Sequence, residues 1–367
     1  MSETTVRGRA MVLEEFGRPL VPREFEVTLT GGEAVVRLAA AGLCGSDVHM
    51  QRGEDPRTPL PLILGHEGVG HLEVVPPGLT DISGRPLAEG DLVMWNRGIS
   101  CGHCYWCAVK RTPALCPSRK TWGINVSSGV YPYLNGCYAE RIVLGPGTDF
   151  IKIDAAKVPD PAVLVAAGCS GATVAHGYEL VRPEVGDVVV VQGPGPVGIF
   201  AAAFALRHGA SAVVVIGGSE ARLQMAERFG ALTLNRRTTS EAERRAFVAE
   251  LTAGRGADIV VEASGTTAAI TEGLGLVRRG GAYLSLGIAV PEGPVTIDPF
   301  ADLNSRNIRF QGSWVSDTRH TVEAVDLVVR QPELFAPLVT HRFPLAEANE
   351  ALAAMAGREC VKAVLVP

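Results

Sequence analysis

The chain has 367 residues, of which 47% are hydrophobic and 20% are charged, a composition typical of globular proteins. A chain longer than about 300 residues does not form one ordinary core, so we expect two domains. The formal net charge of −5 gives no electrostatic basis for binding nucleic acid or an anionic membrane, and we expect neither partner.

The N-terminal segment, residues 1–7, lacks the apolar core of a secretory signal peptide. Apolar runs such as 162–167 and 188–191 are too short to span a bilayer. The eight cysteines of such a chain are expected to be reduced thiols that bind metal rather than partners in disulfides. These features predict a cytoplasmic protein.

Residues 1 to about 165 are rich in turns and short apolar runs. Runs such as 33–38 and 91–95 are bounded by Gly, Pro or Asp, which is typical of β-strands. No helical stripe of useful length is present there. The first half therefore predicts a mostly β domain with long loops.

Near residue 160 the pattern changes. An alanine-rich helix is predicted over 161–180, because Pro161 suits a first helical turn. Beyond it, apolar strands alternate with helices, which indicates a parallel sheet covered on both faces. The predicted strands are 187–191, 211–216, 258–262 and 282–286, and the predicted helices are 196–208, 220–229 and 267–277. From about residue 312 the content is mixed, and the chain ends in an apolar strand over 361–366.

A glycine-rich loop, residues 192–198, joins the first of these strands to its helix. Gly193 permits a tight turn, Gly195 lets a pyrophosphate approach the backbone, and Gly198 lets the helix pack on the strand. The N-terminus of the helix then faces the negative charge of the phosphates. The loop predicts a dinucleotide-binding Rossmann domain, and a tight turn without a ligand is the alternative.

Four cysteines lie close together in the first half, with two, two and eight residues between them: Cys101, Cys104, Cys107 and Cys116. Thiolates at this spacing can surround one tetrahedral ion, and four sulfur ligands make a closed structural Zn²⁺ site. An iron–sulfur cluster, or four unrelated buried cysteines, remain alternatives. A DNA-binding zinc finger is not expected, because the basic residues near the loop form no stripe. These residues are Lys110, Arg111, Arg119 and Lys120.

Three further residues with metal-binding side chains, Cys44, His66 and Cys169, are scattered along the chain. Spacing alone does not join them, and each by itself is typical of packing or ordinary hydrogen bonding. Their surroundings are more specific: Gly-Leu-Cys-Gly-Ser-Asp-Val-His, Gly-His-Glu-Gly and Gly-Cys-Ser-Gly-Ala-Thr. Together with the four-cysteine loop and the glycine loop, these motifs make the whole chain resemble the medium-chain, zinc-dependent alcohol dehydrogenase family.

The resemblance implies a catalytic zinc site. Cys44, His66 and Cys169 match the three zinc ligands of the family, and Glu67 matches the adjacent carboxylate that can enter the coordination shell. Two thiolates and an imidazole leave a fourth position open, where zinc acts as a Lewis acid on an alcohol or a carbonyl. Many polyol dehydrogenases carry glutamate at the position of Cys169, so the cysteine points away from a sorbitol-type enzyme.

The resemblance also implies roles for other residues. Ser46 and His49 match the proton relay of the family, and the alternative is that they are a turn residue and a surface histidine. Thr173 matches a position beside the nicotinamide, and Lys362 matches a basic residue near the cofactor phosphates. The cofactor-binding loop would comprise Gly193, Gly195, Pro196, Val197 and Gly198.

The sequence departs from the family pattern in two places. The stretch from Cys107 to Cys116 is one residue longer than usual. The acidic residue that ends the second Rossmann strand in NAD-preferring members is absent, and Glu220 would repel a phosphate only if it turned inward. Gly217 leaves room for a 2′-phosphate, Ser219 can hydrogen-bond to it, and Arg222 adds a positive charge that is compatible with either cofactor. NADP is therefore favoured over NAD.

The predicted fold class is α/β, a doubly wound Rossmann domain (169–311) with a mostly β, GroES-like zinc-binding domain (1–168 and 312–367). The predicted function is hydride transfer between an alcohol, or its aldehyde or ketone, and NADP or NAD, with two zinc ions per chain, one catalytic and one structural. A polyol or amino-alcohol dehydrogenase and a non-enzymatic nucleotide-binding redox sensor are the alternatives. The resemblance implies a homodimer or homotetramer, joined through sheet edges such as 282–286. Residues expected to face the substrate are Trp95, Asn96 and Trp122.

Overall fold

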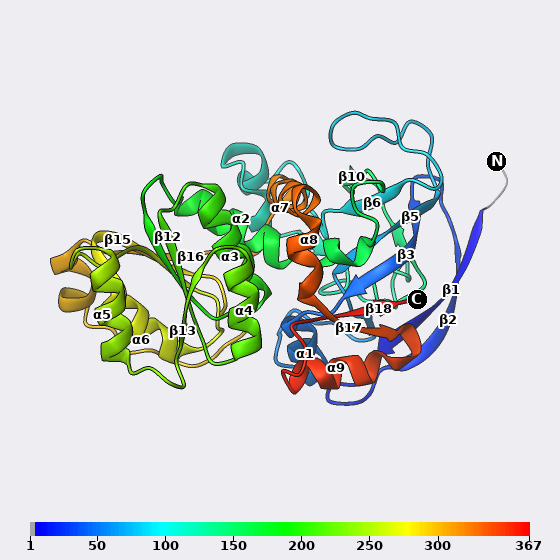
Figure 1. The fold of residues 1–367 in the computed structure, drawn as a ribbon. Coiled ribbons are helices and arrows are strands. Elements are labelled where there is room, and N and C mark those ends of the chain that lie inside the picture. The colour runs from blue at the N-terminus through cyan, green and yellow to red at the C-terminus, as the bar shows by residue number, and fades with distance from the viewer. Residues whose placement is uncertain (1–3) are drawn as a thin grey trace. The chain divides into compact units, whose positions relative to one another are not determined.

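A computed structural model describes residues 4–367 and contains two compact units (Figure 1). The first unit runs to Cys169 and resumes over Asp317–Pro367, and the second is Ser170–Ser316. The return to the first unit thus lies at 317 rather than at the expected 312, because Arg309–Gly312 is still a strand of the second unit. Residues 1–3, where the sequence predicts no signal peptide, lie outside the described residues.

The first unit is mostly β, as its turn-rich sequence predicts, and its strands pair mostly in antiparallel fashion. Its largest sheet has the order β10-β6-β5-β3-β18-β17, with β9 also paired to β3. Seven strands form it: β3 (Ala34–Gly42), β5 (Glu67–Val74), β6 (Leu92–Trp95), β9 (Arg141–Leu144), β10 (Phe150–Lys152), β17 (Val339–Pro344) and β18 (Lys362–Val366). A second sheet contains β1 (Thr5–Leu13), β2 (Val21–Thr28) and β4 (Leu62–Ile63). A two-stranded ribbon pairs β7 (Gly98–Ile99) with β8 (Lys120–Thr121).

Four α-helices complete the described part of the first unit: α1 (Gly45–Arg52), α7 (Thr318–Arg330), α8 (Pro332–Phe335) and α9 (Ala348–Ala356). The sequence analysis missed α1, because eight residues are too few to show a helical stripe. Local contacts define its ends instead. The Cys44 amide donates to Asp47 Oδ2 at 2.8 Å at the start, and Gly53 adopts a left-handed conformation, with φ of 78°, at the end.

The second unit is the predicted doubly wound domain. Its six strands are all parallel, in the order β13-β12-β11-β14-β15-β16. They are β11 (Val188–Gln192), β12 (Ala212–Gly217), β13 (Leu232–Asn235), β14 (Ala257–Glu262), β15 (Val277–Ser285) and β16 (Arg309–Gly312). The helices are α2 (Ser170–Leu180), α3 (Pro196–Arg207), α4 (Glu220–Arg228), α5 (Glu241–Leu251) and α6 (Thr267–Leu276). In Figure 1, α3 and α4 lie on one side of this sheet and α5 and α6 on the other, so the apolar strand β11 is buried throughout.

Two predicted features of this region are wrong. The expected single helix over 161–180 is a 3₁₀ helix, Pro161–Gly168, followed by α2, and the two are separated by a non-helical Cys169 with φ of −127° and ψ of −74°. The segment 282–286 is not a sheet edge, because β15 pairs with β14 on one side and β16 on the other. The edge strands of this sheet are β16 and β13. The dimer or tetramer remains a prediction that light scattering can check.

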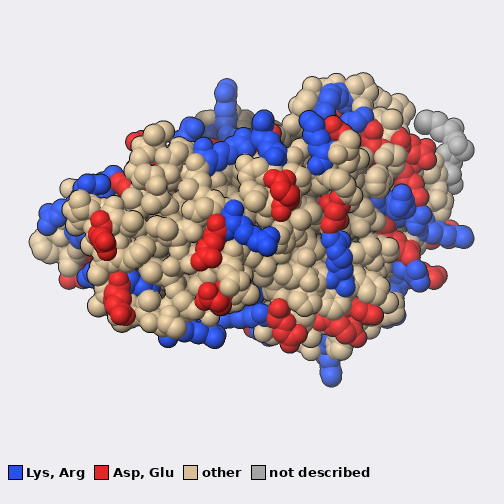
Figure 2. All heavy atoms as spheres, in the orientation of Figure 1, with Lys and Arg blue, Asp and Glu red and all other residues tan. Residues whose placement is uncertain are grey.

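Charges of both signs are interspersed on the face of the molecule seen in Figure 2. None of the helices in residues 4–367 combines the length and the apolar character that crossing a membrane requires.

Candidate functional site

Cys44 lies at the junction between β3 and α1. Its backbone amide belongs to the first turn of α1 through the bond to Asp47. The amide of the buried Leu43 donates to Ala363 O at 2.9 Å, which ties the same junction to β18. The position of the Cys44 thiol is therefore determined both by a helix start and by the sheet.

His66 and Glu67 lie where the chain enters β5, and both are almost fully buried. Gly65 has φ of 92°, and a Cβ there would lie 2.4 Å from the ring of Tyr138, so only glycine suits this turn. On β3, a Cβ at Gly42 would lie 2.3 Å from Glu67 Oε2. Gly65, in the turn before β5, thus allows the close packing of this turn against Tyr138, and Gly42 on β3 leaves the space in which the carboxylate of Glu67 lies.

The irregular backbone at Cys169 brings its sulfur to 4.0 Å from the sulfur of Cys44, 125 positions away in the sequence. One donor atom from each of Cys44, His66, Glu67 and Cys169 lies within 4.8 Å of those of the other three. The structure therefore brings together all four residues that the resemblance assigns to a catalytic metal site. We call these four residues the metal group.

The donor atoms of the metal group fit a Zn²⁺ ion. Two sulfurs, an imidazole nitrogen and a carboxylate oxygen are ligands that zinc uses in proteins. Glu67 Oε1 is buried and accepts no hydrogen bond from residues 4–367, so a lone pair is free for a cation.

The surroundings of the metal group lower the pKa of Cys44 but raise the pKa values of His66 and Glu67. The thiol of Cys169 hydrogen-bonds to Cys44 and lowers the pKa of the Cys44 thiol well below its ordinary value. Burial acts to lower the pKa of His66, but the carboxylate of Asp47 and the thiolate of Cys44 together outweigh burial and raise this pKa to about 9. Burial raises the pKa of Glu67 to about 7, although the ammonium of Lys362 opposes the shift. Protons and a metal ion therefore compete for the same donor atoms.

Lys362 is buried in the first unit, beside the metal group. It is 1% exposed, and its Nζ donates to Glu67 Oε2 at 2.7 Å and to Leu43 O at 2.9 Å. The cause is the pairing of β18 with β3, which sets the lysine beside the metal group. Its ammonium is thus engaged by Glu67, and a contact to the cofactor phosphates stays a prediction.

Asp47 is a site residue that the sequence analysis did not single out. It is fully buried, its Oδ1 lies 3.3 Å from His66 Nδ1, and its Oδ2 accepts from the hydroxyl of Tyr138 at 3.0 Å. Because Nδ1 faces this carboxylate, Nε2 is the imidazole nitrogen available to a metal ion. In the sequence, the only signal for this role of Asp47 was its position three residues after Cys44.

Asp47→Asn is expected to weaken zinc binding at the metal group by roughly 10- to 100-fold, the usual effect of losing a carboxylate behind a histidine ligand. The amide can still accept from the Cys44 amide and Tyr138, so the fold should persist. Competition with a zinc chelator measures the change. Asp154→Asn, at an exposed carboxylate, is the matched control. Equal zinc affinity of Asp47→Asn and the unmodified protein would contradict this role of Asp47.

Arg97 is a second residue that the sequence analysis missed. It is 5% exposed, its Nη1 donates to Gly168 O at 3.4 Å, and its guanidinium hydrogen-bonds to the thiol of Cys169. Burial acts to lower its pKa, but the negative character of Cys169 and Cys44 raises it. A permanent positive charge therefore lies against the metal group.

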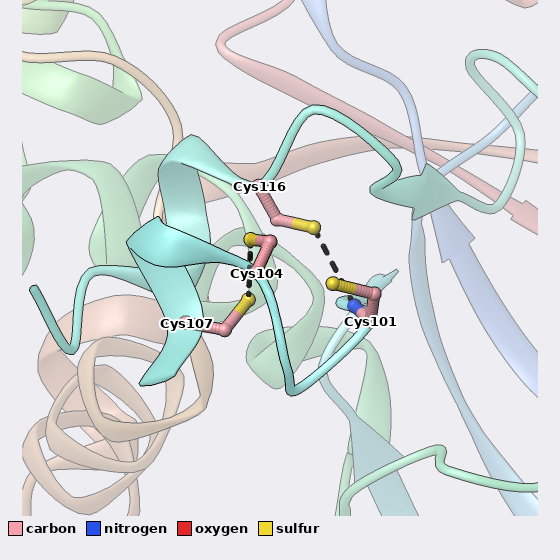
Figure 3. A group of neighbouring side chains, drawn as sticks. All are labelled: Cys101, Cys104, Cys107 and Cys116. Carbon is pink, nitrogen blue, oxygen red and sulfur yellow. Dashed lines mark hydrogen bonds between the residues drawn. The ribbon is translucent and has the colours of Figure 1, made fainter. Parts of the chain in front are cut away.

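The four clustered cysteines converge as their spacing predicts (Figure 3). Their sulfurs all lie within 4.8 Å of one another; Cys104 and Cys107 are 3.5 Å apart, and the Cys101 amide donates to Cys116 Sγ at 3.4 Å. The amides of His103 and the following residue lower the pKa of the Cys101 thiol to about 6. This arrangement is not that of four unrelated cysteines, and it fits four sulfur ligands around one ion.

Ser46 and His49 both lie on α1. His49 Nδ1 is 2.5 Å from Glu54 Oε2, and the histidine side chain is 30% exposed. In the described residues no hydrogen bond joins Ser46 to His49, so the proton relay stays a prediction. Glu54, which the sequence analysis did not name, places an exposed carboxylate beside the imidazole of His49.

The glycine loop joins β11 to α3 in the predicted way. Gly193 has φ of 113°, and a Cβ at Gly198 would lie 1.8 Å from Gly193 O, so both glycines are required by the close turn. Around Gly195, no atom lies within 4 Å of where a Cβ would stand. The first residues of α3, Pro196 and Val197, therefore begin a helix whose N-terminus has room for a pyrophosphate.

The end of β12 carries no carboxylate. The strand stops at Gly217, and Ser219 precedes α4 without capping it by its side chain. The carboxylate of Glu220 accepts from Asn235 Nδ2 at 3.1 Å, and Arg222 lies half-buried on the same helix. The carboxylate of Glu220 is thus engaged by Asn235, at the end of β13.

Two arginines that the sequence analysis missed approach the same corner from the end of β13. The Nε atoms of Arg236 and Arg237 lie 3.1 and 3.3 Å from the position of a Cβ on Gly218. Both side chains are exposed, and within residues 4–367 neither guanidinium has a hydrogen-bond or ion-pair partner. They offer two free cations where a ribose phosphate would lie.

The residues expected to face the substrate are packed in the first unit. Trp95 and Trp122 are each 4% exposed, and Asn96 Nδ2 donates to Thr318 Oγ1 at 3.0 Å. Thr173 lies half-buried on α2, and its place beside a nicotinamide stays a prediction.

Comparison with known proteins agrees with this arrangement. Residues 30–155 match the family model of the alcohol dehydrogenase GroES-like domain, and residues 196–330 match that of zinc-binding dehydrogenases. The chain is similar to the 5-exo-hydroxycamphor dehydrogenase of Pseudomonas putida, with 36% identity over 91% of each chain. Its fold is similar to that of an alcohol dehydrogenase of Thermotoga maritima, with a TM-score of 0.96 and 49% identity over 99% of this chain and 100% of the other. A zinc-binding dehydrogenase of Sinorhizobium meliloti, solved with NADP, has a TM-score of 0.84 and 26% identity over 99% and 100%.

Proposed function

This chain belongs to the medium-chain, zinc-dependent alcohol dehydrogenase family and is an oxidoreductase, and from this premise we propose that it transfers hydride between an alcohol, or the corresponding aldehyde or ketone, and NADP. The observation that carries the proposal is the metal group, in which four buried or half-buried donors from distant segments lie within 4.8 Å of one another. A nucleotide-binding redox sensor has no need for such a group.

Cys44, His66 and Cys169 would hold the catalytic zinc ion, with Glu67 able to enter the coordination shell. Bound there, zinc supplies Lewis acidity to an alcohol or carbonyl oxygen. Asp47 orients the imidazole of His66, and Lys362 balances the charge of Glu67. The glycine loop and the N-terminus of α3 would hold the cofactor pyrophosphate.

A proton must leave the alcohol as it is oxidised. We propose that Ser46 receives it and that His49 passes it towards water. Glu54, whose Oε2 lies 2.5 Å from His49 Nδ1, would orient the imidazole for this transfer. The four-cysteine cluster would hold the second, structural zinc ion.

The preference for NADP is supported by Arg236 and Arg237, which can bind a 2′-phosphate, and by the absence of a carboxylate at the end of β12. Replacing both arginines by alanine is expected to lower the ratio of kcat/KM for NADP over NAD at least tenfold, about 1.4 kcal/mol, because charge-assisted bonds to the phosphate are lost. Initial rates with both cofactors and one alcohol measure the ratio. Arg228→Ala, at the end of α4, is the control.

A second variant tests the same corner by adding a negative charge instead of removing positive charges. Gly218→Asp introduces a carboxylate beside the arginines and should also shift the ratio towards NAD. Gly217 is unsuitable for this change, because a Cβ there would lie 2.4 Å from Pro194 Cγ. An unmodified enzyme that prefers NAD, with both variants unchanged, would show that the proposed cofactor preference is wrong.

The decisive experiment is turnover of a panel of alcohols, polyols, amino alcohols and carbonyl compounds with NADP and NAD. Oxidation of simple alcohols, abolished by a chelator and restored by zinc, is the expected result. Exclusive use of polyols or amino alcohols would favour that alternative, and the absence of all turnover by the zinc-loaded protein would favour the sensor.

A further inference from the structure

Two arginines of the β7–β8 ribbon have buried hydrogen-bond donors that no described residue satisfies. Arg97 immediately precedes β7, and Arg119 immediately precedes β8. The guanidinium of Arg97 reaches Gly168 O and Cys169, but its Nε is buried without a partner. In Arg119, Nε, Nη1 and Nη2 are all buried, and within residues 4–367 none has an acceptor.

Arg119 is held where it is by close packing. A Cβ at Gly98 would lie 2.1 Å from Arg119 Nε, so the guanidinium rests directly on the backbone of the ribbon. Burial lowers the pKa of Arg119 to about 10, and the nearby charge of Arg97 acts in the same direction. Trp122, whose backbone amide donates to Arg97 O, adds an indole Nε1 that is buried and unpartnered. At this ribbon, five buried donor atoms of Arg97, Arg119 and Trp122 therefore have no hydrogen-bond acceptor within residues 4–367.

Such an arrangement is unfavourable unless something supplies the acceptors, because a buried cation has lost its water. The burial of Arg97 is explained in part by its contact with Cys169, because its positive charge offsets the negative charge of the thiolates in the metal group. It does not account for Arg119, which makes no hydrogen bond to any thiol. Asp317 and Cys116 lie close enough to raise its pKa, but neither is its hydrogen-bond partner.

We propose that Arg97 and Arg119, with Trp122 Nε1, form an anion subsite beside the metal group, and that the substrate is a hydroxy acid or oxo acid whose carboxylate binds there. Guanidinium forks match the planar carboxylate with parallel hydrogen bonds. Arg97 also contacts Cys169, so the bound carboxylate would lie near the zinc position. The inference rests on the proposed function and specifies its substrate class: the hydroxyl-bearing carbon gives a hydride to the cofactor, the hydroxyl loses its proton, and the carboxylate is unchanged.

The kinetic test compares hydroxy acids with their primary amides, which have the same shape without the charge. For 2-, 3- and 4-hydroxybutanoate, the zinc-loaded enzyme is expected to show a higher kcat/KM for at least one acid than for its amide. Arg119→Met should lower that acid-to-amide ratio by roughly tenfold to a hundredfold, the effect of losing charge-assisted hydrogen bonds. Arg119→Lys should retain part of the preference. Arg111→Met, at an exposed arginine between Cys107 and Cys116, should leave the ratio unchanged.

Direct binding separates the subsite from the reaction. Calorimetric titration of the zinc-loaded protein should show binding of acetate but not of acetamide, with the acetate signal lost in Arg119→Met. Turnover of neutral alcohols without preference for any acid, and without acetate binding, would overturn the subsite while leaving the proposed function intact. Acetate binding to a protein that oxidises no alcohol would instead refute the proposed function alone. If Arg119→Met does not fold, absence of acetate binding to the unmodified protein still overturns the inference.

Discussion

Cys44→Ser is expected to reduce turnover by on the order of a thousandfold or more, with little change in melting temperature. A serine hydroxyl stays protonated at neutral pH and is a poor zinc ligand, so the Lewis acidity of the site, worth several kcal/mol, is lost. At 1.36 kcal/mol per tenfold, about 4 kcal/mol corresponds to that factor. Steady-state kinetics, together with zinc content per chain by elemental analysis, measures both the loss and its cause.

The matched control is Cys137→Ala. Cys137 is fully buried in the core of the first unit but is not among the donors of the metal group. This variant should keep its zinc and its turnover and lose only packing energy. If Cys44→Ser retained both zinc ions and ordinary turnover, the metal group would not be the catalytic centre.

Cys104→Ser is expected to act on stability instead. Between Cys101 and Cys116 only Ala114 and Cys116 are buried, so the four sulfurs and their ion, rather than an apolar core, hold this loop. Loss of the ion should remove several kcal/mol. At about 2–4 °C per kcal/mol, the melting temperature should fall by roughly 10 °C. Zinc content should fall from two ions per chain to one.

Below its own melting temperature, the same variant should retain turnover, because the metal group is built from other segments. Thermal scans and kinetics on both variants therefore distinguish the two sites, because Cys44→Ser should lose turnover and Cys104→Ser should lose stability. Equal effects of the two substitutions on melting would contradict the assignment of one structural and one catalytic site. A preparation of unmodified protein with one zinc ion or none would do the same.

The sequence by itself identified the features that depend on neighbours along the chain. The four-cysteine loop was visible because residues a few positions apart can reach one ion whatever the rest of the fold does. The glycine loop was visible because strand, turn and helix follow one another directly. The alternation of apolar strands with helices likewise predicted the doubly wound sheet, since both faces of a parallel sheet are covered.

Only a resemblance, and not spacing, joined Cys44 to His66 and Cys169, because the distance between such residues depends on how β3 and β5 pair and on the break at Cys169. The break itself was hidden, since an alanine-rich run reads as one helix. The edge strand β16 was hidden as well, because its four residues show no apolar run.

Tertiary structure decided where the charged residues lie relative to the candidate sites. Asp47, Arg97 and the pair Arg236 and Arg237 look like ordinary polar residues in the sequence, and Lys362 was identified only through the family resemblance. Their significance comes from burial or from convergence: Lys362 is buried because β18 pairs with β3, and the two arginines approach Gly218 because β13 lies beside β12. Charge interactions depend on distance and on removal from water, and both are set by packing between segments far apart in the chain.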